Sequence, residues 1–215
     1  MRLPPPETLP PAVPSRGTAF TRLLGRLVLG LLGWRLEGTY PDRSKFVLVG
    51  APHTSNWDAV VGLSAAAAYG LEVHFFAKRE AFRGPVGWLL RAFGGIPVDR
   101  SRPGGLVGEA IEEFHRRDAF LLGMTPEGTR GRSDRWKTGF YRIARAVDVP
   151  IVLIPLDYRR KVIGPGPTLH LTDDLAADLR RIVAYFDGVE GKNPELYARP
   201  APDQLMGGDG DGEAG

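Results

Sequence analysis

Residues 45–58 read KFVLVGAPHTSNWD, an apolar run that ends in a polar loop. The run over 45–51 has the length of a buried β-strand, and the Ala-rich segment over 56–69 predicts an α-helix behind it. The loop between them carries His53 and, five residues later, Asp58. A buried strand that feeds a helix is the repeating unit of an α/β domain, so this stretch sets the fold class.

Strands and helices alternate in the same way along the rest of the chain. Further strands are expected over 71–77, 95–98, 119–124 and 151–158, and further helices over 86–93, 106–117, 136–146 and 174–186. This alternation predicts a layered α/β domain with a mostly parallel or mixed sheet flanked by helices. In such domains the working groups lie on loops that leave the carboxyl ends of the strands.

A helix with one apolar face is expected ahead of the sheet, over 18–34. Its apolar residues are Phe20, Leu23, Leu24, Leu27, Val28, Leu31 and Leu32, at the spacing of an amphipathic helix. The apolar run is shorter than the roughly 20 residues that span a bilayer. Arg22, Arg26 and Arg35 near its borders fit a segment that lies in a membrane interface. A helix packed on the core of its own domain is the alternative.

Composition places the chain among globular proteins. Its 215 residues fit one domain, and 43% of them are hydrophobic and 25% charged. With a mean hydropathy of −0.16, these values exclude a polytopic membrane protein and a largely disordered chain. We expect one folded domain over 16–199, between disordered tails at 1–15 and 200–215. The net charge of +3 decides little about partners.

The absence of cysteine excludes disulfides, a thiol nucleophile and a thiolate metal site. The proline-rich stretch over 1–14 lacks the basic and apolar segments of a secretory signal, so cytoplasmic residence is expected. His74, His115 and His170 have no ligand-like spacing with one another or with His53, and no metal site is assigned.

The His53 and Asp58 pair suits general-base chemistry. An aspartate that accepts a hydrogen bond from one imidazole nitrogen fixes the tautomer and leaves the other nitrogen to take a proton from a hydroxyl. If Ser55 caps the helix, Asp58 lies in its first turn and can reach His53. No G-x-S-x-G serine signature accompanies the pair, which favours a hydroxyl that belongs to the substrate. A capping aspartate beside an incidental loop histidine is the alternative interpretation.

Two later loops add charge at the ends of predicted strands. Residues 94–100 read GGIPVDR, and residues 125–130 read TPEGTR. The guanidinium fork suits phosphate, and a glycine lets backbone amides approach an anion. Arg100 and Arg130 can therefore converge on one phosphate, or form structural ion pairs with Asp99 and Glu127. The residues alone do not decide between these two arrangements.

Four blocks, in order and at these spacings, resemble the phospholipid and glycerol acyltransferase family. They are His53-x-x-x-x-Asp58, Gly95-Ile96-x-x-Asp99-Arg100, Pro126-Glu127-Gly128-Thr129-Arg130 and Val149-Pro150-Ile151-Val152. The likeness spans residues 45 to 160, and the family includes enzymes that acylate 1-acylglycerol-3-phosphate. It implies that His53 is the general base and Asp58 its orienter. It further implies phosphate and glycerol binding by Arg100, Glu127, Gly128, Thr129 and Arg130.

The resemblance also implies the reaction and its partners. A fatty acyl group passes directly from an acyl thioester, on coenzyme A or acyl carrier protein, to the hydroxyl of a lysophospholipid such as 1-acylglycerol-3-phosphate. Neither a cofactor nor a metal is expected. The other implied partner is a membrane surface, with the protein held peripherally at the inner face of the cell membrane. No nucleic-acid partner is expected.

Departures from the family pattern leave the acceptor open. Thr125 replaces the Phe common before Pro-Glu-Gly, and the proline of the last block is displaced to Pro155. An amino-acid lipid or a glycolipid is therefore an alternative acceptor. A peripheral protein that binds anionic lipid without turnover, and a hydrolase of acyl esters, are the alternatives from other functional classes.

Overall fold

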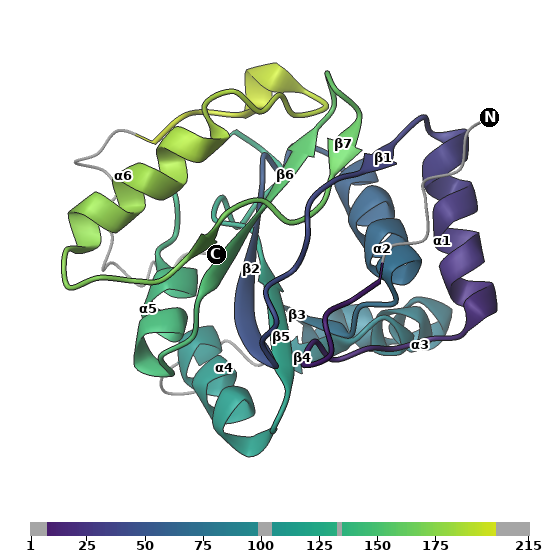
Figure 1. Cartoon of the computed structure of the whole chain (residues 1–215), viewed down its shortest axis with the longest axis horizontal. Coiled ribbons are helices and arrows are strands. Elements are labelled where there is room, and N and C mark those ends of the chain that lie inside the picture. Colours follow the sequence, from purple (N-terminus) through teal and green to yellow (C-terminus); the bar gives the residue numbers. More distant parts are fainter. Residues whose placement is uncertain (1–7, 99–104, 133–134, 201–215) are drawn as a thin grey trace.

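The computed structural model describes residues 8–98, 105–132 and 135–200. One mixed sheet runs through the molecule in the order β1-β7-β6-β2-β5-β3-β4, with β8 also paired to β6 (Figure 1). The strands are β1 (Arg35–Leu36), β2 (Lys45–Ala51), β3 (Val73–Lys78), β4 (Gly95–Val98), β5 (Phe120–Met124), β6 (Ile151–Asp157), β7 (Val162–Ile163) and β8 (Thr168–Leu169). The predicted α/β class with a mostly parallel or mixed sheet is confirmed.

Strand β2 lies at the middle of the sheet, with β5 and β6 parallel to it on either side. Strands β3 and β4 continue the sheet in the same direction. Strands β7 and β8 both run antiparallel to β6, and β1 pairs in parallel with β7. The carboxyl ends of the three central strands therefore meet at one edge.

Six α-helices lie around the sheet in the part of the chain that the structure describes. They are α1 (Ala19–Leu31), α2 (Trp57–Tyr69), α3 (Gly84–Ala92), α4 (Gly105–Arg116), α5 (Gly139–Ala146) and α6 (Leu175–Phe186), with short 3-10 helices at Arg79–Phe82 and Pro194–Leu196. Helices α1 and α2 lie on one side of the sheet, and α4, α5 and α6 on the other (Figure 1).

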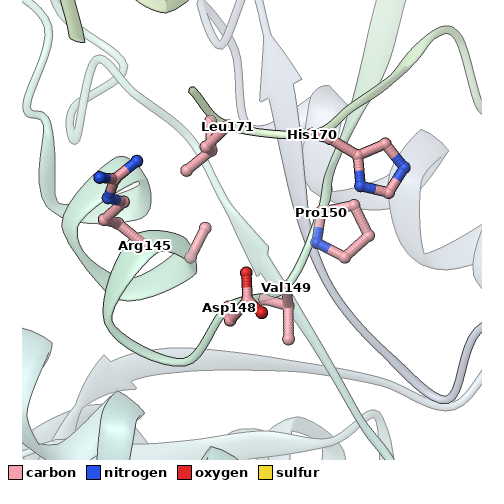
Figure 2. A pocket seen from close by; sticks show the side chains of 7 residues that line it. Arg145, Asp148, Val149, Pro150, His170 and Leu171 are labelled. Atoms are coloured by element: carbon pink, nitrogen blue, oxygen red, sulfur yellow. The ribbon is translucent and has the colours of Figure 1, made fainter. Parts of the chain in front are cut away.

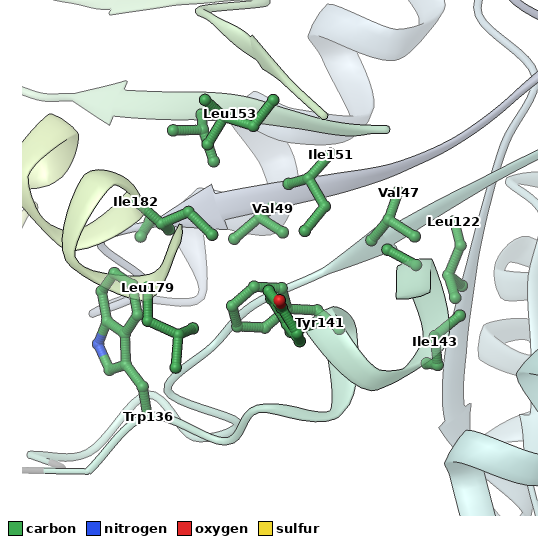
Figure 3. Packing of buried hydrophobic residues seen from close by; sticks show 14 of the residues in the cluster. Val47, Val49, Leu122, Trp136, Tyr141, Ile143, Ile151, Leu153, Leu179 and Ile182 are labelled. Atoms are coloured by element: carbon green, nitrogen blue, oxygen red, sulfur yellow. The ribbon is translucent and has the colours of Figure 1, made fainter. Parts of the chain in front are cut away.

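The alternation of side chains along β2 builds a core on each face of the sheet. Val47 and Val49 join the cluster under α4, α5 and α6, whereas Phe46 and Leu48 join the cluster under α1 and α2. Figure 3 shows the first cluster, in which Val47 and Val49 face side chains of α5 and α6. Because both faces of the strand are covered, its sequence is a continuous apolar run.

Most predicted elements are present with bounds shifted by a few residues. The helix predicted over 136–146 begins only at Gly139. Its expected first residue, Trp136, is buried in the core, and the next backbone N–H donates to the carbonyl of Pro126 at 2.7 Å. The two-residue strands β1, β7 and β8 were not predicted, because so short a pairing leaves no periodic signal.

The expectation of a disordered tail over 1–15 is wrong for residues 8–15. Val13 is buried, and Ser15 forms a β-bridge with Leu71. The N–H of Ala12 donates to a carboxylate oxygen of Asp42 at 2.7 Å. An apolar anchor and these backbone bonds hold the segment on the domain. Residues 201–215 of the predicted second tail lie outside the described residues.

The predicted amphipathic helix corresponds to α1, which begins at a Thr18 cap that forms a reciprocal capping box with Thr21. No described helix combines the length and the apolar character needed to cross a membrane. The face of α1 that packs on α2 carries Gly25 and the fully buried Leu29. Phe20 and Leu31, by contrast, are 71% and 73% exposed.

Two helix glycines test this packing. A Cβ on Gly25 would lie 2.5 Å from the carbonyl oxygen of Ser64 and 2.6 Å from the nitrogen of Ala68, whereas a Cβ on Gly62 of α2 would meet nothing within 4 Å. Helix propensity alone favours alanine at both positions by about 1 kcal/mol. We expect Gly25→Ala to lower the free energy of unfolding by about 1–3 kcal/mol through overpacking. Gly62→Ala should leave it unchanged or raise it.

Urea unfolding of the two variants and of the wild type measures these free energies. An equal gain in stability from both substitutions would contradict the close approach of α1 to α2.

Candidate active site

Three loops meet at the edge of the sheet where β2, β5 and β6 end. The loop after β2 carries His53, the loop after β5 carries residues 125–130, and Tyr158 directly follows β6. The register brings these strand ends level, since Val49 pairs with Met124 and Ala51 with Pro155. Residues from two distant segments therefore meet the loop that carries His53.

The side chains of His53 and Asp58 form the pair that the sequence predicts. The His53 Nδ1 atom lies 3.1 Å from Asp58 Oδ2. The Asp58 side chain is 1% exposed and the His53 side chain 21% exposed. The buried carboxylate thus engages Nδ1, and Nε2 remains as the ring nitrogen that can accept a proton.

The Asp58 carboxylate is held by several donors. Its Oδ2 atom also accepts hydrogen bonds from the backbone N–H groups of Thr54 and Ser55, both at 2.8 Å. Its Oδ1 atom accepts a hydrogen bond from the Tyr158 hydroxyl at 2.6 Å. Burial acts to raise the pKa of Asp58, but hydrogen bonds from the His53 ring, the Tyr158 hydroxyl and a loop N–H outweigh it and lower that pKa. The Asp58 carboxylate is therefore anionic although buried.

The start of α2 differs in detail from the predicted cap. The residue before the helix is Asn56, whose side chain makes no capping bond, and the Ser55 hydroxyl instead accepts from the N–H of Trp57 at 3.2 Å. Asp58 lies in the first turn, as predicted. Its carboxylate folds back to the two N–H groups of the loop because they would otherwise be buried without partners.

The Glu127 side chain lies beneath the His53 loop. Its Oε1 atom accepts a hydrogen bond from the backbone N–H of His53 at 3.0 Å, and the residue is only 5% exposed. Burial raises the pKa of Glu127 above its ordinary value. The family resemblance implies that Glu127 takes part in acceptor binding. The structure places its carboxylate against the backbone of the loop that carries His53.

The last three residues of the 125–130 loop are exposed. Gly128 has a φ of 64°, a conformation that favours glycine, and the stem of Lys137 lies 3.0 Å from the place of its missing Cβ. The Thr129 hydroxyl accepts from a backbone N–H within its own loop. The exposed Arg130 guanidinium donates to the side chain of Asn56. This contact and that of Glu127 both tie the loop to the His53 loop.

Arg100 and Asp99 lie outside the described residues, so the convergence of Arg100 and Arg130 on one phosphate stays a prediction. No group of three metal-ligating side chains is present in the part of the chain that the structure describes.

Sequence reasoning missed the contacts that the C-terminal segment makes with the His53 loop. The side-chain amide of Asn193 donates to the carbonyl of Thr54 at 2.8 Å, and its backbone N–H donates to the Thr54 hydroxyl at 3.1 Å. The Lys192 ammonium lies 4.7 Å from the centre of the Trp57 ring. Tyr158 was missed as well. Tyr158 and Asn193 are 100 and 139 positions from their partners, so no local sequence pattern indicates these contacts.

A hollow of about 220 Å³ lies at the other end of the sheet (Figure 2). It is lined by Ala144, Arg145, Asp148, Val149, Pro150, His170 and Leu171. Val149 and Pro150 precede β6, so this hollow is at the amino end of the strand and His53 is at the carboxyl ends. The hollow is therefore separate from the candidate active site.

Comparisons with known proteins agree with the fold and the family resemblance. A family model described as Acyltransferase matches residues 35–156. The chain is also similar to the crystal structure of the 1-acyl-sn-glycerophosphate (LPA) acyltransferase PlsC from Thermotoga maritima, with a TM-score of 0.55 and 19% sequence identity over 77% of this chain and 74% of that chain. At this identity the similarity shows a shared fold alone. No curated protein matches the chain.

Residues 35–156 are more than half of the chain, and they contain the strand, the loop and the first helical turn that hold His53 and Asp58. The chain belongs to the Acyltransferase family and is an acyltransferase.

Proposed function

We propose that this acyltransferase moves a fatty acyl group from an acyl thioester to the hydroxyl of a lysophospholipid such as 1-acylglycerol-3-phosphate. The donor carries its thioester on coenzyme A or acyl carrier protein. The observation that supports this most strongly is the contact of His53 with the buried Asp58 at 3.1 Å, on a loop at the carboxyl end of the central strand. A protein that only binds lipid does not need a histidine whose ring is oriented by a buried aspartate.

The geometry supports direct transfer with His53 as the general base. Nε2 of His53 takes the proton of the acceptor hydroxyl while the acceptor oxygen attacks the thioester carbonyl carbon. The Asp58 carboxylate stabilises the resulting imidazolium through Nδ1. The tetrahedral intermediate then expels the thiolate, and His53 gives this thiolate the proton that it took from the acceptor hydroxyl. The new ester and the free thiol account for every atom, and no acyl-enzyme forms.

Arg130 supports an acceptor that carries phosphate. Its guanidinium is exposed and lies beside Asn56, three residues after the proposed base. Arginine binds phosphate through two parallel hydrogen bonds. The similar solved structure is that of an enzyme named for 1-acyl-sn-glycerophosphate, a phosphorylated acceptor. A phosphate held by Arg130 would place the glycerol hydroxyl of such an acceptor toward His53.

The α1 helix supports peripheral binding at the inner, cytoplasmic face of the cell membrane. Phe20 and Leu31 are exposed on the side opposite the buried Leu29. On α3, Val86 and Trp88 are 62% and 71% exposed. The side chain of Arg16, just before α1, donates to the carbonyl of Ala92 at the end of α3. Large exposed apolar side chains on adjacent helices are typical of surfaces that enter a lipid interface.

Acyl transfer itself gives the first test of this function. We expect purified protein with 1-acylglycerol-3-phosphate and a labelled long-chain acyl thioester to form the diacyl product, detected by mass. His53→Ala should lower the rate by about 1,000-fold or more, because the base is removed. His170→Ala is the matched control, since this exposed histidine lies by the hollow at the opposite end of the sheet.

A His53→Ala rate close to that of the wild type would rule out the proposed base. Release of free fatty acid in place of the diacyl product would identify a hydrolase.

Arg130→Ala tests the phosphate contact. We expect a loss of about 10- to 100-fold in kcat/KM for the phosphorylated acceptor, the worth of a hydrogen bond between charged groups. The loss for a neutral monoacylglycerol acceptor should be small. Arg43→Ala is the control, because this exposed arginine precedes β2 at the opposite edge of the sheet. Equal losses for the two acceptors would show that Arg130 acts on the fold of the loop.

The exposed face of α1 is tested by vesicle binding. We expect the double substitution Phe20→Ser and Leu31→Ser to weaken sedimentation with anionic phospholipid vesicles by at least about tenfold, since two large apolar side chains no longer leave water. Leu175→Ser on α6 is the control, because Leu175 is also exposed but lies on the other side of the sheet. Unchanged binding of the double variant would contradict a docking role for α1.

A further inference from the structure

Oδ2 of Asp58 contacts His53, and the partner of its other carboxylate oxygen, Oδ1, is Tyr158. We propose that Tyr158 is a positioning residue for acyl transfer: its hydroxyl fixes the Asp58 carboxylate so that Oδ2 stays directed at His53. This proposal rests on the proposed general-base function. Tyr158 lies two residues beyond the segment that matches the family model, so the family motifs do not include it.

The structure holds the Tyr158 side chain in place from several sides. Its backbone N–H donates to the carbonyl of Glu190 at 2.8 Å. The Trp34 ring packs edge-on against its ring, with 4.8 Å between the ring centres and an angle of 89°. The Lys161 ammonium lies 5.4 Å from the centre of the Tyr158 ring and 5.5 Å from that of Trp34. The hydroxyl is thus presented to Asp58 by a preformed framework.

The two carboxylate oxygens of Asp58 have different tasks. Oδ2 accepts from the His53 ring and from two loop N–H groups, and Oδ1 accepts from the Tyr158 hydroxyl at 2.6 Å. The terminal torsion of an aspartate is soft, so bonds to one oxygen leave the carboxylate plane poorly defined. The Asp58 side chain is 1% exposed, and water is excluded as a substitute donor. The Tyr158 hydroxyl therefore sets the angle of the carboxylate plane.

The same bond also sets how strongly Asp58 attracts a proton on His53. Burial raises the pKa of Tyr158, as do the bond to Asp58 and its negative charge, so the hydroxyl stays a donor at neutral pH. A donor on Oδ1 draws electron density from the carboxylate and weakens its pull on the imidazolium. Loss of that donor would therefore strengthen the attraction between the Asp58 carboxylate and the imidazolium.

The other ionisable groups near His53 stay unchanged in the experiment. Glu127 contacts the His53 backbone from the loop after β5. Arg130 and Lys192 lie farther out, over Asn56 and Trp57 respectively. Tyr158→Phe removes one hydroxyl and leaves all of these charges in place, together with the ring that packs on Trp34.

A second tyrosine and aspartate pair in the same chain provides the matched control. The Tyr141 hydroxyl donates to Oδ2 of Asp178 at 3.3 Å, and Asp178 is 2% exposed. This pair joins α5 to α6 and is separate from the His53 loop. Tyr141→Phe therefore removes a hydrogen bond between a tyrosine hydroxyl and a buried aspartate at a site that does not contact His53.

For Tyr158→Phe we expect kcat to fall about tenfold with KM within about twofold, because alignment of the base acts on the transition state. The acid limb of the kcat/KM profile should move to higher pH by about 0.5–1 unit. Tyr141→Phe should change neither quantity. Wild-type kcat and an unmoved acid limb in Tyr158→Phe would overturn the proposal, as would equal effects in the two variants.

An NMR titration of the His53 ring separates this proposal from the proposed function, because it needs no turnover. The pH midpoint of the ring signals should be higher in Tyr158→Phe than in the wild type and unchanged in Tyr141→Phe. A midpoint that is the same in all three proteins would overturn the positioning role even if transfer activity is present. A wild type that transfers no acyl group would refute the function, and the titration would still decide the role of Tyr158.

Discussion

The structure around the active site depends on one buried carboxylate. An aspartate taken out of water costs several kcal/mol unless donors surround it. Asp58 satisfies this condition with a ring nitrogen, two loop N–H groups and a tyrosine hydroxyl. Because these donors come from the loop after β2 and from the residue after β6, the loop can close around the carboxylate in few conformations. The orientation of the His53 ring is thereby set by the fold, as the proposed general-base role requires.

The sheet supplies the rigid base for this arrangement. Strand β2 is paired on both edges and covered on both faces, so the point where it ends is fixed by two cores and two neighbouring strands. Glu127, which follows β5, reaches across to the backbone of His53 and adds a bond from the adjacent strand end. His53, Asp58 and the loop that carries Arg130 are therefore placed by the same three parallel strands.

Local patterns in the sequence were sufficient for the central elements, whereas the contact between His53 and Asp58 was expected from their spacing together with the family resemblance. The run over 45–51 has its observed bounds because a strand buried on both faces needs continuous apolar residues. The sequence could not show that Glu127 is buried, because the motif over 126–130 is equally compatible with an exposed binding loop. The sequence also could not show the hydrogen bond from Tyr158 to Asp58, because the two residues are 100 positions apart in the chain. That contact follows from the pairing of β6 with β2, a property of the whole sheet.

Helix α1 shows why a periodic pattern leaves one question open. The spacing of Phe20, Leu31 and their neighbours predicts a helix with an apolar face but not the direction of that face. Gly25 decides it, because only a residue without a side chain allows the backbone of α2 to come so close. The face of α1 with Gly25 and Leu29 is therefore packed, and Phe20 and Leu31 are left exposed. Trp34 follows α1 by three residues, and its ring packs against the ring of Tyr158. This contact links the helix with the exposed apolar face to the tyrosine that donates to Asp58.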